Sequence, residues 1–493
     1  MLRILGSLRR TCDGLTRRDL LQIGGLGLLG CTLTDACAAE ANASAPRAKS
    51  CILLFLFGSP PQHETFDPKP RAPAEIQGEL KAISTTVPGL DFCEALPLSA
   101  QVADRLTVIR SMSHPYPLHG VAYAITGLPV YTTDLETKPH DPAHWPYFGS
   151  IAEYLWSQES ATLPEEIPRH IGLPWVFNSR VDDLGLIAGP YAASLGQKYD
   201  PLWATYEGRG LAAAPKCRLD QQKEYLDPYQ RAAPEGTFAF DGASRLADSV
   251  SLNRFNLRCS LLEQFDAARR AVDAGGSVGA YSASQARALS LLTSYKVREA
   301  LDVTREAERV RADYGMTLFG QSCLAARRLV EAGSRFVTVF WDAFGTYFSG
   351  GWDTHQNHYP RLKRYLLPGF DAAFSALILD LEQRGLLDET LVLVMSEHGR
   401  TPKIDSKPPG AARHHWSQAY SMVMAGGGTP RGAVVGKTDA IGGTVLDAPI
   451  NPKDIQATAF HLLGIDPDTV IRDSLNRPFR IAGDGHVRPD LIQ

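Results

Sequence analysis

The sequence has few cysteines for its length, and they form no recognisable pattern. There is no CxxC motif and no Cys/His spacing of the zinc-finger type. Three of the eight cysteines lie in the first 40 residues, and the other five are widely spaced: Cys51, Cys93, Cys217, Cys259 and Cys323. An odd number at wide spacing argues against a disulfide scaffold. Cys51 and Cys323 stand among apolar residues, which predicts that they are small buried side chains.

The chain also lacks a basic stripe and a long apolar run. Beyond the N-terminus the lysines and arginines are scattered, and the formal net charge is −4, so no nucleic-acid partner is predicted. The apolar stretch IGGLGLLGCTL at 23–33 is too short for a bilayer, which needs roughly 20 helical residues. We therefore expect no transmembrane segment in the mature chain. With 44% hydrophobic and 21% charged residues, the composition is typical of a globular protein with a large core.

The N-terminus has the three regions of an export signal. Several arginines and the stretch TRRDLLQ precede the apolar run, and the small residues ACAAEANASA follow it. We predict a signal over 1–38, with cleavage after Ala36-Cys37-Ala38. The arginine pair with Leu20 and Leu21 resembles a twin-arginine signal, whose partner is the twin-arginine export machinery. A lipoprotein cysteine at Cys31 is a less favoured alternative, because Leu29 stands where a small residue is preferred. The expected location is periplasmic or extracellular.

Beyond the signal, the pattern predicts one α/β domain over 45–485. Apolar runs predict strands at 51–58, 105–113, 168–177, 335–341, 391–395 and 419–427. An apolar stripe predicts a helix over 360–384. Asn at the N-cap, Pro at N1 and Asp at N3 predict another over 451–464. A shorter helix is expected to end at Gly127, and a mostly helical insertion is expected around 195–315.

Polar clusters follow two of these strands. GGWDTHQNH comes after strand 335–341, and SEHGR comes directly after strand 391–395. A strand, helix and strand of these lengths form a βαβ unit with parallel strands, and ligands bind beyond the carboxyl ends of such strands. We therefore expect both clusters at one edge of the sheet. The loop RHHW at 413–416 and the histidines after strand 105–113 extend the set, so that eight of the 13 histidines gather there or at His63.

Imidazole and carboxylate side chains gathered at one edge predict a metal site. These ligands suit zinc, manganese, iron or magnesium, and two such ions could bind an anionic ester and activate an attacking group. The expected metal ligands are Asp353, His355, Glu397, His398 and His415.

Each of these residues also has a structural interpretation. Glu397 and His398 could form a salt-bridged strand end, and His415 could pack beside Trp416. His414 is the less certain histidine of its pair. His119 could be a residue without chemistry at a helix N-terminus.

Seven ordered motifs resemble those of a known family. They are FLFGSPPQHETFDPKP, RSMSHPYPLHGVAYAITG, AGPYAASLG, YGMTLFGQSCLAARRLVEAG, WDTHQNH, SEHGRTPKI and RHHWSQAYSMVMAGGG. Together they look like a secreted, twin-arginine-exported family of unknown function within the alkaline phosphatase and sulfatase superfamily. The resemblance covers nearly the whole mature chain. It implies a three-layer αβα sandwich around a mostly parallel sheet, with two metal positions at the strand ends.

The superfamily pattern also assigns ligands. Its acidic-histidine pair after a late strand matches Glu397-His398, with Glu where Asp is commoner. Its pair one strand earlier matches Asp353 and His355 at a shorter spacing, and its last metal histidine matches His415.

Two departures concern the reaction. The superfamily's first strand usually ends in a metal-binding Asp, whereas this one ends Gly58-Ser59 and the nearest acids are Glu64 and Asp67. Its nucleophile is a Ser, Thr or Cys at the start of the helix that ends in TG. Here the stretch PLHGVAYAITG has none before Thr126. A metal-activated water attacking directly would need no such residue.

The sequence therefore favours an exported, metal-dependent hydrolase of sulfate or phosphate esters. His119 or His114 would act on the leaving group or help to bind the anion, and Arg400 would steady its charge. The alternative is a non-catalytic phosphatase-like protein that binds anionic, sulfated glycans. The missing nucleophile favours this alternative, and the density of ligand-type residues argues against it.

Overall fold

The computed structural model describes most of the chain beyond residue 46. The described residues are 47–116, 120–127, 136–159, 167–181, 185–213, 226–240, 294–344, 351–473 and 476–493. The predicted export signal at 1–38 lies outside them. Among the described residues, no helix combines the length and apolar character needed to cross a membrane.

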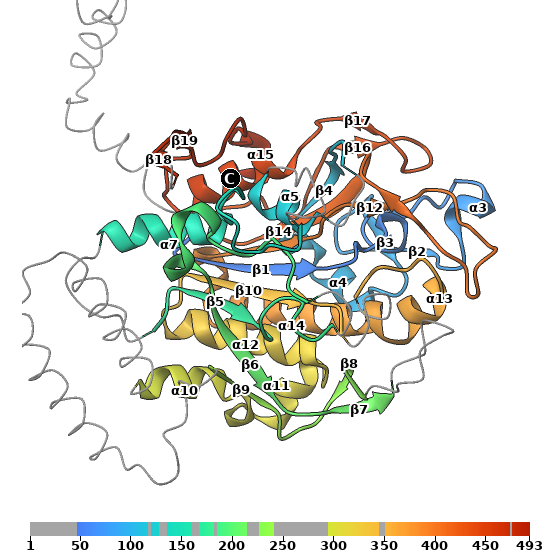
Figure 1. Cartoon of the computed structure of the whole chain (residues 1–493). Helices are drawn as coiled ribbons and strands as arrows, with labels where there is room; N and C mark the ends of the chain where they lie inside the picture. The colour runs from blue at the N-terminus through green and yellow to red at the C-terminus, as the bar shows by residue number, and fades with distance from the viewer. Residues whose placement is uncertain are drawn as a thin grey trace, which may run out of the picture. The chain divides into compact units, whose positions relative to one another are not determined.

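A twisted central sheet positions the rest of the described structure (Figure 1). Its strands in spatial order are β15 (Ala433–Val435), β4 (Leu106–Met112), β14 (Tyr420–Ala425), β11 (Thr390–Met395), β1 (Ser50–Leu56), β10 (Phe336–Trp341), β5 (His170–Leu173), β6 (Leu202–Glu207) and β9 (Thr237–Phe240). From β11 to β6 every neighbouring pair is parallel, whereas β14 runs antiparallel to both β11 and β4. The predicted α/β class with a mostly parallel sheet is confirmed.

Strand β1 shows why the predicted strands read as continuous apolar runs. Ile52, Leu54 and Leu56 belong to one buried core, whereas Leu53 and Phe55 belong to a second core. Successive side chains of a strand point to opposite faces, so each face of the sheet has its own core. Burying each such side chain contributes about 1.5–3 kcal/mol. A strand covered on both faces therefore has no polar alternation.

Helices cover both faces and complete the three layers. Helices α12 (Leu318–Ala332) and α14 (Leu367–Gln383) supply side chains to the first core. Helices α5 (Val121–Thr126), α7 (Phe148–Glu159) and α15 (Pro452–Leu462) supply side chains to the second. Figure 1 shows α12 and α14 on the side of β1 opposite to α15. The predicted αβα arrangement is therefore confirmed.

Helix α15 begins where its sequence predicts. The Asn451 side chain accepts hydrogen bonds from the backbone N–H groups of Lys453 and Asp454, at 2.8 and 3.1 Å. The Asp454 carboxylate in turn accepts one from the Asn451 N–H at 3.2 Å. This reciprocal capping box satisfies donors that the first helical turn leaves without partners.

The predicted helix over 360–384 forms as contiguous helical residues, but its hydrogen-bond pattern changes along the way. It comprises α13 (His358–Arg361), a π-helical turn over Leu362–Leu366 and then α14. Pro368 lies in the first turn of α14. Because proline has no N–H, it cannot continue the regular ladder, and the wider turn falls directly before it.

The expectation of helices around 195–315 is wrong for its first described part. Residues 202–240 contain β6, β7 (Gly210–Ala213), β8 (Leu226–Ala232) and β9, and β6 and β9 extend the central sheet. Helices α10 (Tyr295–Leu301) and α11 (Glu308–Asp313) follow later. Residues 241–293 lie outside the described part. The shorter helix that was expected to end at Gly127 is α5, which comprises Val121–Thr126 and has Gly127 as its C-cap.

Candidate metal centre

The loops that follow β1, β10 and β11 meet at the carboxyl edge of the sheet. The Gly58 N–H after β1 donates to Glu397 Oε1 after β11, at 2.8 Å. The Trp352 N–H donates to the carbonyl of Phe57 at 2.8 Å. Gly58 has φ +97°, and a Cβ at this position would overlap the backbone of Trp352 and Asp353. Close approach of the two loops therefore requires glycine here.

A β-hairpin brings the last histidines to the same edge. Strands β12 (Gly399–Arg400) and β13 (His415–Trp416) pair antiparallel, and Asp405 forms an antiparallel bridge with Ala412 further along the loop. The Thr401 N–H donates to the carbonyl of His414 at 2.8 Å. The hairpin thus fixes residues 413–416 beside the segment that follows β11.

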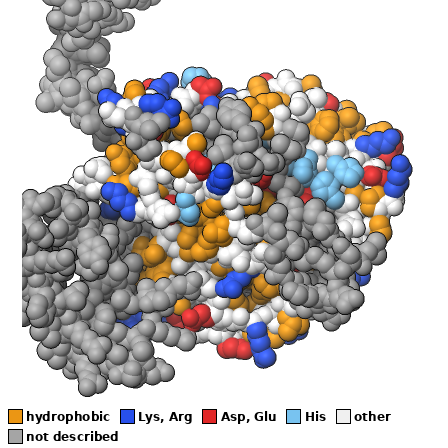
Figure 2. Space-filling model, viewed as in Figure 1, with side chains coloured by type: hydrophobic (Ala, Val, Ile, Leu, Met, Phe, Trp, Pro, Cys, Tyr) orange, Lys and Arg blue, Asp and Glu red, His pale blue; other side chains and the backbone are white. Residues whose placement is uncertain are grey.

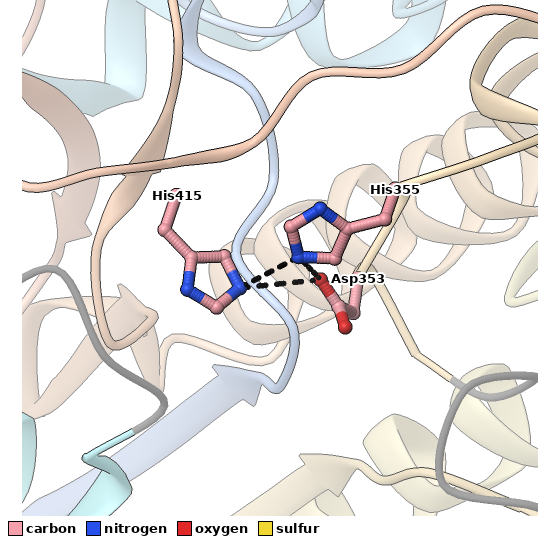
Figure 3. Close-up of side chains that lie close together, drawn as sticks. All are labelled: Asp353, His355 and His415. Atoms are coloured by element: carbon pink, nitrogen blue, oxygen red, sulfur yellow. Dashed lines mark hydrogen bonds and ion pairs between the residues drawn. The ribbon is translucent and has the colours of Figure 1, made fainter. Parts of the chain in front are cut away.

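Asp353, His355 and His415 converge at the centre of this edge (Figure 3). The distance between the Nε2 atoms of His355 and His415 is 2.9 Å. Asp353 Oδ1 lies 3.1 Å from His355 Nε2 and 3.6 Å from His415 Nε2. The Asp353 side chain is buried, whereas those of His355 and His415 are 33% and 21% exposed. The cluster is therefore open to solvent on its histidine side.

These three side chains fit a divalent metal. Two ligand atoms at the usual zinc distances in a tetrahedral site lie about 3.3 Å from one another, close to the three spacings observed. The donor set of two imidazoles and one carboxylate also suits zinc or a first-row transition metal. Three protein ligands with a solvent-facing side are typical of catalytic metal sites.

Arg400 supports the carboxylate of this cluster. Its Nη2 donates to Asp353 Oδ1 at 2.6 Å, its Nε donates to the carbonyl of Ser59 at 3.1 Å, and it also bonds the carbonyl of Gly58. The Arg400 side chain is fully buried. Sequence reasoning gave Arg400 the task of steadying a bound anion. Its burial and these contacts instead place it behind Asp353, so we revise its role to holding that ligand.

Glu397 and His398 lie next to the cluster. Both are buried, and the ring centroid of His398 lies 4.6 Å from that of His415. His398 Nδ1 lies 2.8 Å from the carbonyl of Gly399. Since a carbonyl only accepts, Nδ1 carries the proton and Nε2 carries the lone pair. This tautomer is common among metal-binding histidines.

His114 contacts the segment that contains Glu397 and His398. Its Nε2 donates to the carbonyl of Glu397 at 2.7 Å, and its Nδ1 accepts from the Tyr116 N–H at 3.2 Å. Burial lowers the pKa of His114 to about 4. A neutral imidazole with both nitrogens bonded to backbone groups supports the Glu397 backbone, a role that sequence reasoning did not give it. His119 lies outside the described residues.

The structure adds a buried ion pair that sequence reasoning did not connect. Arg413 donates to Glu64 Oε1 through Nε and Nη2 at 3.0 and 2.6 Å, and His358 Nε2 lies 3.5 Å from Glu64 Oε2. Burial alone would raise the pKa of Glu64, but Arg413 and His358 outweigh it and lower the pKa to about 2. Glu64 had been noted as the nearest acid after the first strand. Its partner, 349 residues away, left no local signal.

A second addition extends the cluster outward. His414 Nδ1 lies 2.8 Å from His355 Nδ1, and His414 Nε2 lies 3.3 Å from Asp405 Oδ2. The sequence pattern makes His414 the less certain histidine of its pair, and it gives no signal for Asp405. Figure 2 shows histidine side chains gathered on the exposed face, toward the side where β12 lies in Figure 1.

The fold and this cluster define an α/β protein with a candidate metal centre at the carboxyl edge of its sheet. The sequence model of a family described as "Protein of unknown function (DUF1501)" matches residues 48–492. The chain therefore belongs to that family. No curated protein matches the chain.

Several solved structures share a distant similarity. The PsFucS1 sulfatase from Pseudoalteromonas sp. is 12% identical with a TM-score of 0.38, over 92% of this chain and 75% of the sulfatase. A phosphonate monoester hydrolase from Silicibacter pomeroyi is 11% identical with a TM-score of 0.33, over 89% and 75% of the two chains. At these TM-scores the likeness supports no functional conclusion.

Proposed function

We propose that the protein is an exported, metal-dependent hydrolase of sulfate or phosphate esters. The observation that carries the proposal is the convergence of Asp353, His355 and His415 at the open edge of the sheet, where their ligand atoms lie 2.9, 3.1 and 3.6 Å from one another. The ester class comes from the resemblance of the sequence motifs to the alkaline phosphatase and sulfatase superfamily.

Each residue of the candidate centre has its own role in the proposed site. Asp353 supplies negative charge and is held in place by Arg400, while His355 and His415 supply neutral nitrogen ligands. Glu397 and His398 would hold a second ion next to the first. A bound divalent metal would act as a Lewis acid toward an ester oxygen and would activate a water molecule. The exposed sides of His355 and His415 leave room for an anionic substrate to approach.

Export is part of the same proposal. The arginine pair and the apolar run of the N-terminal segment would direct the chain to the twin-arginine machinery, which carries folded cargo. A protein exported this way can acquire its metal before it leaves the cytoplasm. The proposed location is the periplasm or the extracellular space.

The direct test is metal analysis of the purified protein, combined with a substrate screen. We expect about one to two equivalents of a divalent metal per chain, one at Asp353, His355 and His415 and a second where Glu397 and His398 would hold another ion. Hydrolysis of aryl sulfates or aryl phosphates should disappear in His398→Ala together with some of the metal. Full activity in that variant would contradict the assignment of His398.

A second candidate is a binding protein for anionic, sulfated glycans that has lost catalysis. The observation that favours it is the start of α5, where Val121-Ala122-Tyr123 supplies no Ser, Thr or Cys. Glycan binding by the metal-loaded protein, without turnover of aryl or polymeric esters, would support this candidate over the hydrolase.

A further inference from the structure

We propose that Asp405 and His414 are positioning residues that set the tautomer of His355, so that its Nε2 lone pair faces the metal centre. This inference rests on the proposed metal site and adds two residues that no ligand pattern assigns. They act through the far nitrogen of His355.

Asp405, His414 and His355 form a chain of three side chains. Asp405 Oδ2 lies 3.3 Å from His414 Nε2, and His414 Nδ1 lies 2.8 Å from His355 Nδ1. The opposite nitrogen of His355, Nε2, lies 3.1 Å from Asp353 Oδ1. Each imidazole thus uses one nitrogen toward Asp405 and the other toward the cluster.

Asp405 sets the direction of the hydrogen bonds in this chain. Hydrogen bonds to backbone and to His414 lower the pKa of the Asp405 carboxyl, and an ionised carboxylate only accepts. In a neutral imidazole His414 Nε2 therefore donates, and its Nδ1 is the acceptor. His355 Nδ1 must then donate to His414, and His355 Nε2 is left with a lone pair directed at the cluster.

A lone pair at this position is the form that a metal ligand needs. Without a cation, His355 Nε2 and Asp353 Oδ1 would be two acceptors facing each other at 3.1 Å, an unfavourable contact. A divalent cation held by His355 and Asp353 would make the same arrangement favourable, because both atoms would then be ligands. Carboxylate–histidine–metal arrangements of this kind fix the ring and raise the basicity of the ligand. Here a second imidazole relays the effect of the carboxylate.

The hairpin holds the chain in register. Asp405 is fixed by its bridge to Ala412 and by its Oδ1, which accepts from the Lys407 N–H at 3.0 Å. His414 is fixed by its backbone bonds to Thr401. Asp405 and His414 therefore lose little conformational entropy when their side chains form this chain with His355.

Asp405→Asn is the most informative variant, because it reverses the direction of the hydrogen bonds while it keeps the shape of the side chain. The amide oxygen can keep the bond to the Lys407 N–H, which turns the amide NH2 toward His414 Nε2. His414 Nε2 then accepts, and the chain reverses, so that His355 Nε2 carries a proton that competes with metal. His414→Ala removes the relay altogether. Asp466→Asn is the matched control, because Asp466 caps the same type of turn through the Asp468 N–H at 2.9 Å.

The experiment measures the affinity for Zn²⁺ by chelator competition, and the absorption spectrum with Co²⁺, in the full chain. We expect the Kd of Asp405→Asn and His414→Ala to rise about 10-fold or more, with an altered Co²⁺ spectrum. The control should match wild type, and thermal unfolding should show that all variants are folded. Wild-type affinity and spectrum in both variants would overturn the inference and leave the metal site intact. A wild-type protein that binds no metal would overturn the proposed function and this inference together.

Discussion

The two halves of the candidate centre differ in burial and in the kind of residue that builds them. The inner half consists of Arg400, Arg413, Glu64 and His358, all buried and held by ion pairs and backbone carbonyls. The outer half consists of His355, His414, His415 and Asp405, which are partly or largely exposed. Asp353 joins them, since it contacts Arg400 on one side and His355 on the other.

This difference in burial distinguishes residues that stabilise the fold from residues that can bind a ligand. A buried ion pair costs much to break, because the remaining charge has no water to solvate it. Exposed histidines contribute little to folding but can exchange ligands with solvent. We infer that the inner half keeps the loops in place and that the outer half binds. Variants in the two halves should therefore affect different measurements.

The largest expected effect on stability belongs to Glu64→Gln. The change leaves the buried Arg413 guanidinium without its counter-charge, which should lower the free energy of unfolding by about 3–5 kcal/mol. Chemical denaturation measures it. Glu79→Gln is the control, because its pair with Lys363 is exposed and should change stability by less than about 1 kcal/mol. Equal effects of the two variants would contradict the large contribution that we assign to the buried pair of Glu64 and Arg413.

The second expected effect is a pH dependence of the free energy of unfolding, and it comes from His63. This histidine directly precedes Glu64 of the inner ion pair. Burial, and then Arg413, lower the pKa of His63 to about 4 from 6.5. A histidine whose folded pKa is depressed stabilises the fold above pH 6.5, and this contribution is lost as the pH falls from 6.5 to 4. The full shift corresponds to about 3 kcal/mol. Unfolding free energies at several pH values, in wild type and His63→Gln, measure it. A parallel pH dependence in the two proteins would contradict the assignment.

The smallest effect on stability should be that of His414→Gln. His414 is 48% exposed, so its replacement should change the free energy of unfolding by less than about 0.5 kcal/mol. Denaturation measures this change, and the affinity for Zn²⁺ should fall in the same variant. A loss of stability as large as that of Glu64→Gln would show that the outer half also holds the fold.

Sequence patterns sufficed for six strands of the sheet, namely β1, β4, β5, β10, β11 and β14, and for the convergence of Asp353, His355 and His415. The apolar runs identify buried strands, and the parallel arrangement brings the segments after β10 and β11 to one edge. The capping residues of α15, Asn451 and Asp454, are three positions apart, so the local sequence is enough to predict them. Strands β6 to β9 were missed because 202–240 has no continuous apolar run comparable to β1.

The roles of Arg400 and Asp405 could not be predicted in the same way. An arginine beside ligand-type residues suggests anion binding, and only its burial behind Asp353 shows that it supports a ligand. Asp405 reaches His414 through the return of a hairpin whose register depends on tertiary contacts. Glu64 meets Arg413 across almost the whole length of the chain. Contacts of this kind arise from the fold and produce no recognisable spacing pattern in the sequence.

The central claim is that Asp353, His355 and His415 bind a divalent metal. The most direct test is metal content by elemental analysis of the wild-type protein and of His415→Ala, with thermal unfolding in the presence of added Zn²⁺ and Mn²⁺. We predict at least about one equivalent per chain in wild type, a rise in melting temperature with metal, and loss of both in His415→Ala with the fold intact. No bound metal and no shift in the wild-type protein would contradict it.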